Sequence, residues 1–327
     1  MKTIKSLLLF INVVLISVVF CSSDIKERNG LLWKISGNGL AEPSYLFGTA
    51  HGGPFLSASL LLDSIPHLYD ALASSKQFVG EKNIFNPANF DKSRLLMEAD
   101  SSYALLLNKE DLALLDTCTV KYFHSTSDKI RLKPFYLFGA IISKRTIEKG
   151  REIAYKNLKT KKYVTDADLD EYDSISEESM DLFLQKKAYS KGLSIVGLDD
   201  IIGFRSKDTI PLTKQVEQLM YGLRNMDKFI DEYFNDPSII AFKNAYYGQN
   251  LDEIEKQLTA FHPDSTNVIN IIVGDLVYDR NLKWMDQIPL LISEKPSFIA
   301  VGVRHLPGKD GLIDLLRRKG YTVESVK

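Results

Sequence analysis

Two histidines stand in similar surroundings near opposite ends of the 327-residue chain. His51 ends the segment Tyr45-Leu-Phe-Gly-Thr-Ala-His51, and His305 ends the segment Ile299-Ala-Val-Gly-Val-Arg-His305. Each segment is an apolar run typical of a strand, followed by Gly, two residues and His. We expect the Gly to allow a positive φ and a close backbone approach. Each His should then lie near the carboxyl end of its strand, where open α/β sheets bind ligands, and the two strands could be neighbours in one sheet.

A carboxylate has the same placement, because Glu81 directly follows the predicted strand 77–80. Two imidazoles and a carboxylate are a common ligand set for a divalent metal ion, with positions left for water and substrate. The ion would acidify its water for hydrolysis. Taken singly, each histidine is equally explained as a satisfied loop residue and Glu81 as a solvated acid.

The elements that must position these residues alternate between strands and helices. Strands are predicted at 31–35, 45–47, 77–80, 193–196, 296–301 and 321–326, the first two as a hairpin. Helices are predicted at 57–72, 95–107, 109–123, 134–149, 168–189, several over 205–260, 266–288 and 311–319. The alternation favours an α/β fold, with a central, mostly parallel or mixed sheet and helices on both faces. No linker interrupts residues 24–327, which favours one domain with a helical insertion over about 90–190.

Residues 1–23 have the pattern of a secretory signal peptide. Lys2 and Lys5 precede the apolar run 7–20, and Cys21 and Ser23 place small side chains before a cleavage at Asp24. The alternatives are an uncleaved N-terminal anchor, or a lipoprotein acylated at Cys21. The predicted location is therefore exported: periplasmic, cell-surface or secreted.

Composition excludes several classes of protein. Lys and Arg total 41 against 42 Asp and Glu, a formal charge of −1, which gives no electrostatic case for nucleic acid. Two cysteines, Cys21 and Cys118, exclude a disulfide scaffold, and Cys118 is predicted to be a buried, inert thiol. Beyond the N-terminus, no stretch approaches the roughly 20 apolar residues of a membrane helix. The sequence does not indicate the oligomeric state.

Two blocks of the sequence resemble the ends of the TraB/GumN family, which includes the animal Tiki proteins. The first block is 33–35 with 43–51, and the second is 301–308 with 311–323. The resemblance extends over nearly all of residues 31–326. Glu81 matches the family's acid after the second-block strand, and Arg280-Asn281 matches its Arg-Asn pair on the penultimate helix.

The resemblance implies a metal-dependent peptidase acting on a peptide or protein substrate. It implies a fold like that of erythromycin esterase and ChaN proteins, and a divalent ion of the manganese, cobalt or zinc type. His51, Glu81 and His305 would be the metal residues. Glu81, Arg280 and Asn281 would be catalytic, with Glu81 either a ligand or the general base. Arg280 suits a carboxylate or a developing oxyanion, and a structural salt bridge between helix and sheet explains it equally well.

The leading hypothesis is therefore an exported metal-dependent hydrolase, specifically a peptidase. The alternative is a non-catalytic binding protein for a peptide, metal or haem, and a third is an esterase or glycan hydrolase. Three features depart from the family pattern. Arg304 precedes His305 where a small residue is common, Gly197-Leu-Asp-Asp200 replaces a commoner Gly-Leu-Glu, and Gly52-Gly53 follows His51.

Overall fold

The structure is a computed structural model that describes residues 29–50, 58–90, 95–166, 169, 178–202, 210–260 and 274–327. The predicted signal segment 1–23, His51 and Gly52-Gly53 lie outside these residues. Within the described ranges, no helix combines the length and apolar character needed to cross a bilayer.

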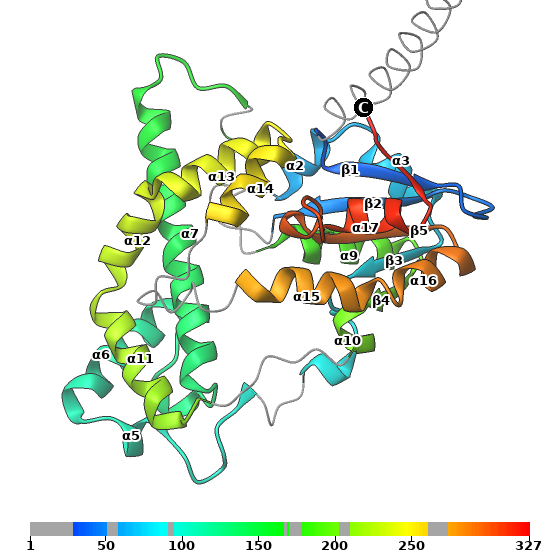
Figure 1. The fold of residues 1–327 in the computed structure, drawn as a ribbon. Helices are drawn as coiled ribbons and strands as arrows, with labels where there is room; N and C mark the ends of the chain where they lie inside the picture. Colours follow the sequence, from blue (N-terminus) through cyan, green and yellow to red (C-terminus); the bar gives the residue numbers. More distant parts are fainter. Residues whose placement is uncertain are drawn as a thin grey trace, which may run out of the picture.

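A six-stranded mixed sheet, packed among helices, lies on the right in Figure 1, and a group of helices that includes α7 (Pro134–Thr160) and α11 (Leu212–Arg224) lies to its left. The strand order of the sheet is β4-β3-β5-β2-β1-β6. The strands are β1 Leu32–Ser36, β2 Ser44–Thr49, β3 Gln77–Gly80, β4 Ser194–Gly197, β5 Ser297–Gly302 and β6 Thr322–Ser325. Strands β4, β3, β5 and β2 run parallel, while β1 is antiparallel to both β2 and β6. The predicted strands and the mostly parallel sheet are confirmed.

The central strands are covered on both faces. Every residue of β3 and of β5 is buried, as expected for parallel strands between two layers of helices. Helix α3 (Leu68–Ser74) packs against β2, α9 (Met180–Ser190) packs against β3 and β4, and α17 (Leu312–Arg318) packs against β6. The α/β fold predicted from the alternation is thereby confirmed.

Two predicted helices are wrong in part. The helix expected over 57–72 is divided into α2 (Ala58–Asp63) and α3, because His67 after Pro66 takes the left-handed φ of 57°. The helix expected over 95–107 is reduced to α5 (Tyr103–Leu106), and Leu96 forms an isolated bridge with Leu132 instead. In both cases the spacing of apolar residues was compatible with a helix, but the backbone adopted a non-helical conformation at His67 and at Leu96.

The remaining helices follow the predicted pattern with shifted ends, except for the short helix at 198–202, which was not predicted. They are α6 Lys109–Phe123, α7 Pro134–Thr160, α10 Leu198–Ile202, α11 Leu212–Arg224, α12 Met226–Asn235, α13 Pro237–Tyr247, α14 Leu251–Ala260, α15 Gly274–Trp284 and α16 Ile288–Glu294. Helix α7 runs past the predicted end at 149. The helix predicted over 266–288 ends at Trp284, because α16 restarts at Ile288 with Pro289 in its first turn.

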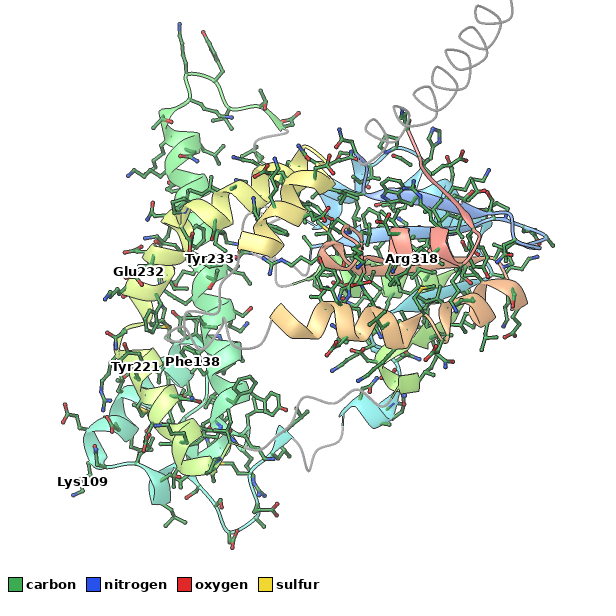
Figure 2. All side chains as sticks on the ribbon, in the orientation of Figure 1. Lys109, Phe138, Tyr221, Glu232, Tyr233 and Arg318 are labelled. Atoms are coloured by element: carbon green, nitrogen blue, oxygen red, sulfur yellow. The ribbon has the colours of Figure 1, made fainter. Side chains whose placement is uncertain are left out.

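Two hydrophobic clusters form the interior of the described residues. One surrounds the sheet, and the second lies among α5, α6, α7 and α11 beside it (Figure 1). In the second cluster, Phe138 of α7 lies so close to Gly222 of α11 that a Cβ there would be 2.4 Å from its ring (Figure 2). Helix α11 thus packs with the helices of the predicted insertion, although it follows them by many residues in the chain.

Candidate functional site

The carboxyl ends of the parallel strands meet at one edge of the sheet. Thr49 pairs in register with Gly302, and Gly80 pairs with Ala300 and Gly197. Because β5 lies between β2 and β3, the segment carrying His305 leaves the sheet between two others. One leads toward His51, and the other begins at Glu81. The predicted adjacency of the two histidine-bearing strands is confirmed, while His51 itself lies outside the described residues.

The two glycines of the paired motifs occupy different positions and make different contacts. Gly48 lies inside β2 opposite Val301, and Gly302 ends β5 with φ −50°, so the predicted positive φ is wrong. The predicted close approach is correct at Gly48, where a Cβ would lie 2.8 Å from the Val303 side chain. Gly302 instead donates its N–H to Oε1 of Glu81 at 2.8 Å. Because Gly302 pairs with Thr49 and not with Gly48, the two motifs are offset by one residue in the sheet. Their identical spacing in the sequence gives no sign of this offset.

His305 and Glu81 face each other at this edge. The Nε2 atom of His305 lies 3.7 Å from Oε1 of Glu81, and the histidine is only 3% exposed. Arg280 donates to the second carboxylate oxygen of Glu81, and the Glu81 carbonyl accepts the N–H of Asp199 at 2.8 Å. Both the side chain and the backbone of Glu81 are thus held in place.

Asn281 determines which ring nitrogen of His305 carries the hydrogen. Its Nδ2 donates to the carbonyls of His305 at 3.1 Å and Asp310 at 2.8 Å. Its Oδ1 is therefore the atom that faces the ring, 2.6 Å from Nδ1 of His305, and it must accept. The ring hydrogen sits on Nδ1, so the Nε2 lone pair lies on the side of Glu81 and Arg280. Metal-binding histidines are typically oriented in this way.

Arg280 joins the acidic groups of the site. Its guanidinium donates to Glu81, and to Asp199 from Nε at 3.2 Å and from NH2 at 2.8 Å. Its NH1 lies 3.3 Å from Nε2 of His305. Burial opposes the charge of Arg280, but the two carboxylates outweigh it and raise the pKa of the guanidinium. The predicted salt bridge between helix and sheet is present, and it lies within the candidate site.

Asp199 is a site residue that the sequence reasoning missed. It is 2% exposed and accepts a third donor, Nε1 of Trp284, at 3.1 Å. Burial raises the pKa of Asp199, although Arg280 opposes that rise. Trp284, expected only in the core, also packs against His305 with ring centroids 4.5 Å apart. The available signal was position, because Asp199 is the second residue after β4, much as Glu81 is the first residue after β3.

The donors at this edge suit a divalent ion. Nε2 of His305 is an imidazole nitrogen without a hydrogen, on a ring that Asn281 holds in place, and Glu81 supplies a carboxylate beside it. Within the described part of the chain, no three His, Cys, Asp or Glu side chains form a metal-binding group. A third ligand would have to come from elsewhere, and the predicted one, His51, follows β2. An ion at Nε2 and the Arg280 contact would exclude each other, because both need the same lone pair.

Comparison with known proteins now decides the family. The model of the TraB/PrgY/gumN family matches residues 31–325. The chain belongs to the TraB/PrgY/gumN family. Among curated proteins, it is similar to Metalloprotease TIKI2 of Danio rerio, with 22% identity over 339 residues. The match includes 91% of this chain and 61% of that relative, so the chain spans about three fifths of its length. No solved structure matches the chain.

Membership confirms the resemblance predicted from the paired motifs. It also gives the edge of the sheet a context. Glu81, Arg280, Asn281 and His305 all lie within the matched range and are contributed by segments far apart in the chain. Glu81, His305 and Asp199 all contact the guanidinium of Arg280 or the amide of Asn281, both on α15. That helix is therefore the element that joins the strand ends into one site.

Proposed function

We propose that this member of the TraB/PrgY/gumN family is an exported metal-dependent hydrolase that cleaves peptide bonds. The observation that carries the proposal is the fixed His305 ring, whose unprotonated Nε2 lies 3.7 Å from the Glu81 carboxylate at the ends of parallel strands. The similar zebrafish protein is described as a metalloprotease, which favours a peptide over other substrates. Residues 1–23 would direct export.

The proposed roles follow from the contacts. His305 and His51 would hold the ion, with Glu81 as a third ligand or as the base that takes the water proton. The ion would supply Lewis acidity, which activates water and polarises a carbonyl. Arg280, once released from Nε2 of His305, has a donor for the carbonyl oxygen of the scissile bond. Asp199 positions Arg280 by accepting from Nε and NH2.

Metal content tests the first part of the proposal. The chain without residues 1–23 is loaded with manganese, cobalt or zinc, dialysed and measured by mass spectrometry. We expect one equivalent in the wild type, lost in His51→Ala and in His305→Ala. The matched control is His67→Asn, because His67 is an exposed histidine away from the site and Asn tolerates its left-handed φ. Equal metal content in all four proteins would contradict the shared site.

Glu81→Gln separates the two roles of Glu81. The amide preserves the shape of the side chain but removes its charge. Retained metal with lost cleavage of a mixed peptide library would make Glu81 the base. Loss of the metal would make it a ligand. A wild type that binds the metal and peptides, yet cleaves neither peptide nor ester substrates, would overturn the hydrolase and favour the binding protein.

A further inference from the structure

Arg304 occupies an unusual position beside the candidate site. It lies between Val303, 1% exposed, and His305, 3% exposed, in the 3-10 turn η4 (Val303–His305) that follows β5. Its own side chain is partly exposed. The guanidinium carbon lies 5.1 Å from the ring centroid of Phe242 in α13. Arg304 thus directly precedes His305, while its guanidinium lies on an aromatic ring of α13.

The aromatic platform under Arg304 is tied to the edge of the sheet. Phe242 packs against Tyr246, with ring centroids 6.2 Å apart. Tyr246 is fully buried, and its hydroxyl donates to the Gly48 carbonyl near the end of β2 at 2.8 Å. The position of the guanidinium is therefore coupled to the strand that leads toward His51. A group bound by Arg304 would lie close to the ends of β2 and β5.

The charge of Arg304 is not balanced in the way that the charge of Arg280 is. Arg280 has two carboxylates in contact with its guanidinium. Among the described residues, the guanidinium of Arg304 contacts the Phe242 ring. It forms no hydrogen bond or ion pair with any of them. Partial burial accordingly lowers the pKa of Arg304. A guanidinium stays charged in proteins, so this arrangement leaves a forked, partly desolvated donor on the Phe242 ring, one residue before His305 in the chain.

We propose that Arg304 binds a carboxylate of the peptide substrate and so selects acidic peptides. The inference rests on the proposed function and adds the substrate class. The guanidinium fork matches a carboxylate bidentately, and the aromatic platform reduces the entropy lost on binding. The carboxylate is an Asp or Glu side chain or the free C-terminus, two sources with the same chemistry. An arginine that only covers Phe242 would show no such selection.

The test compares the purified exported protein with three variants. Arg304→Gln removes the charge, Arg304→Lys retains charge without the fork, and Lys309→Gln removes an exposed nearby cation as the matched control. Each protein is treated with a randomised peptide library, and cleaved sites are read by mass spectrometry. Libraries with free and with amidated C-termini separate the two sources of carboxylate. Metal-free proteins are also applied to a peptide array, which needs no turnover.

We expect acidic peptides to be enriched by the wild type and by Lys309→Gln. The enrichment should fall by about 10- to 100-fold in Arg304→Gln, the range for losing a charge-assisted hydrogen bond. Arg304→Lys should retain part of it. Circular dichroism establishes that each variant folds, and Arg304→Met, which retains the aliphatic contact with Phe242, replaces Arg304→Gln if that variant does not.

Each outcome decides the proposal. A wild type without acidic preference in either assay, or a preference unchanged in the folded charge-removing variant, overturns the role of Arg304. Failure of the proposed function is distinguishable. If the wild type binds acidic peptides through Arg304 but cleaves none, the hydrolase is wrong and the carboxylate site stands. If it cleaves peptides without acidic preference, the hydrolase stands and the carboxylate site is wrong.

Discussion

At the scale of residues, one arginine determines the charge balance of the site. Glu81 and Asp199 contribute two negative charges and Arg280 one positive, so the cluster has a net charge of −1 before any ligand arrives. All three side chains are at most 15% exposed. Bringing such charges out of water is costly unless they are paired, and Arg280 pairs both carboxylates at once. A further cation is favoured in these surroundings.

Replacing Arg280 should expose that cost. Arg280→Met removes the guanidinium that pairs with both buried carboxylates, and we expect the free energy of unfolding to fall by about 3–5 kcal/mol. Adding Asp199→Asn should restore part of the loss, because one uncompensated charge is removed. Urea denaturation followed by fluorescence measures both. An Arg280→Met protein as stable as the wild type would show that these ion pairs do not stabilise the fold.

Asn281 offers a test of the histidine tautomer. Asn281→Leu removes the acceptor for Nδ1 of His305 and the donor to two carbonyls. We expect the affinity for manganese to fall about 10- to 100-fold, the range for outer-shell partners of metal ligands. Asn281→Asp, which retains an acceptor for Nδ1, should lose less. Calorimetric titration measures each affinity, and equal values for Asn281→Leu and the wild type would contradict the role of Asn281.

Cys118 provides a pH-dependent prediction away from the site. It is buried in the second hydrophobic cluster, and burial raises the pKa of its thiol. Because the thiolate is the reactive form, a raised pKa means less thiolate at a given pH. In a Cys21→Ser background, alkylation by iodoacetamide at pH 8 should be much slower in the folded protein than in denaturant, and should accelerate as the pH rises further. Equal rates in both states would contradict a buried thiol.

At the scale of elements, α15 presents the site as one face of a helix. Arg280, Asn281 and Trp284 stand at positions i, i+1 and i+4 and reach His305 together. Asp279, by contrast, is exposed. The buried face follows Val277, Asn281 and Trp284. A polar Asn belongs on this face because its amide is fully hydrogen bonded there.

The contact between β2 and the turn η4 gives a prediction with an internal control. Gly48→Ala would place a Cβ 2.8 Å from Val303, 3.0 Å from Leu306 and 3.1 Å from the Val303 backbone. We expect a loss of about 1–3 kcal/mol from overpacking, together with weaker metal binding, since η4 carries His305. Gly139→Ala in α7 meets nothing within 4 Å and should stabilise the protein by about 0.5–1 kcal/mol. Thermal unfolding of both variants compares the signs, and a neutral Gly48→Ala would contradict the close packing.

At the scale of the whole molecule, the two hydrophobic clusters stabilise different parts of the fold. The sheet cluster supports the strand ends, and the cluster of α5, α6, α7 and α11 lies beside it (Figure 1). Leu137 is fully buried in the second cluster and Leu72 in the first. A large-to-small substitution in one cluster should therefore destabilise mainly the elements that surround that cluster.

Leu137→Ala and Leu72→Ala test this division. Each should destabilise the protein by about 2–5 kcal/mol through lost burial and a cavity. Hydrogen exchange should then accelerate mainly in α6, α7 and α11 for Leu137→Ala, with metal binding at His305 retained. For Leu72→Ala, exchange should accelerate in the strands. Uniform acceleration over both clusters in either variant would show that they unfold as one unit.

Much of the fold follows from local sequence. The strands are short apolar runs bounded by Gly and Pro. Such a run is too short for a helix, and a buried strand in a sheet satisfies both its apolar side chains and its backbone hydrogen bonds. The hairpin of β1 and β2 is similarly local, since Gly37 and Gly39 take the positive φ values of 77° and 82° that its turn requires. Helix ends were less predictable at His67 and Trp284, where a single backbone angle or a restart at a proline overrides apolar periodicity.

The candidate site divides along the same line. The sequence by itself determined the family, the parallel strand ends and the residue types His305 and Glu81, because a strand followed by Gly and a polar side chain is a local pattern. Only the tertiary structure decided that Asp199 joins them, that Asn281 fixes the His305 tautomer, and that Arg304 lies on Phe242. These contacts join residues far apart in the chain, and their energies come from burial, hydrogen-bond geometry and charge pairing. Those quantities exist only once the strands are paired and α15 has packed against their ends.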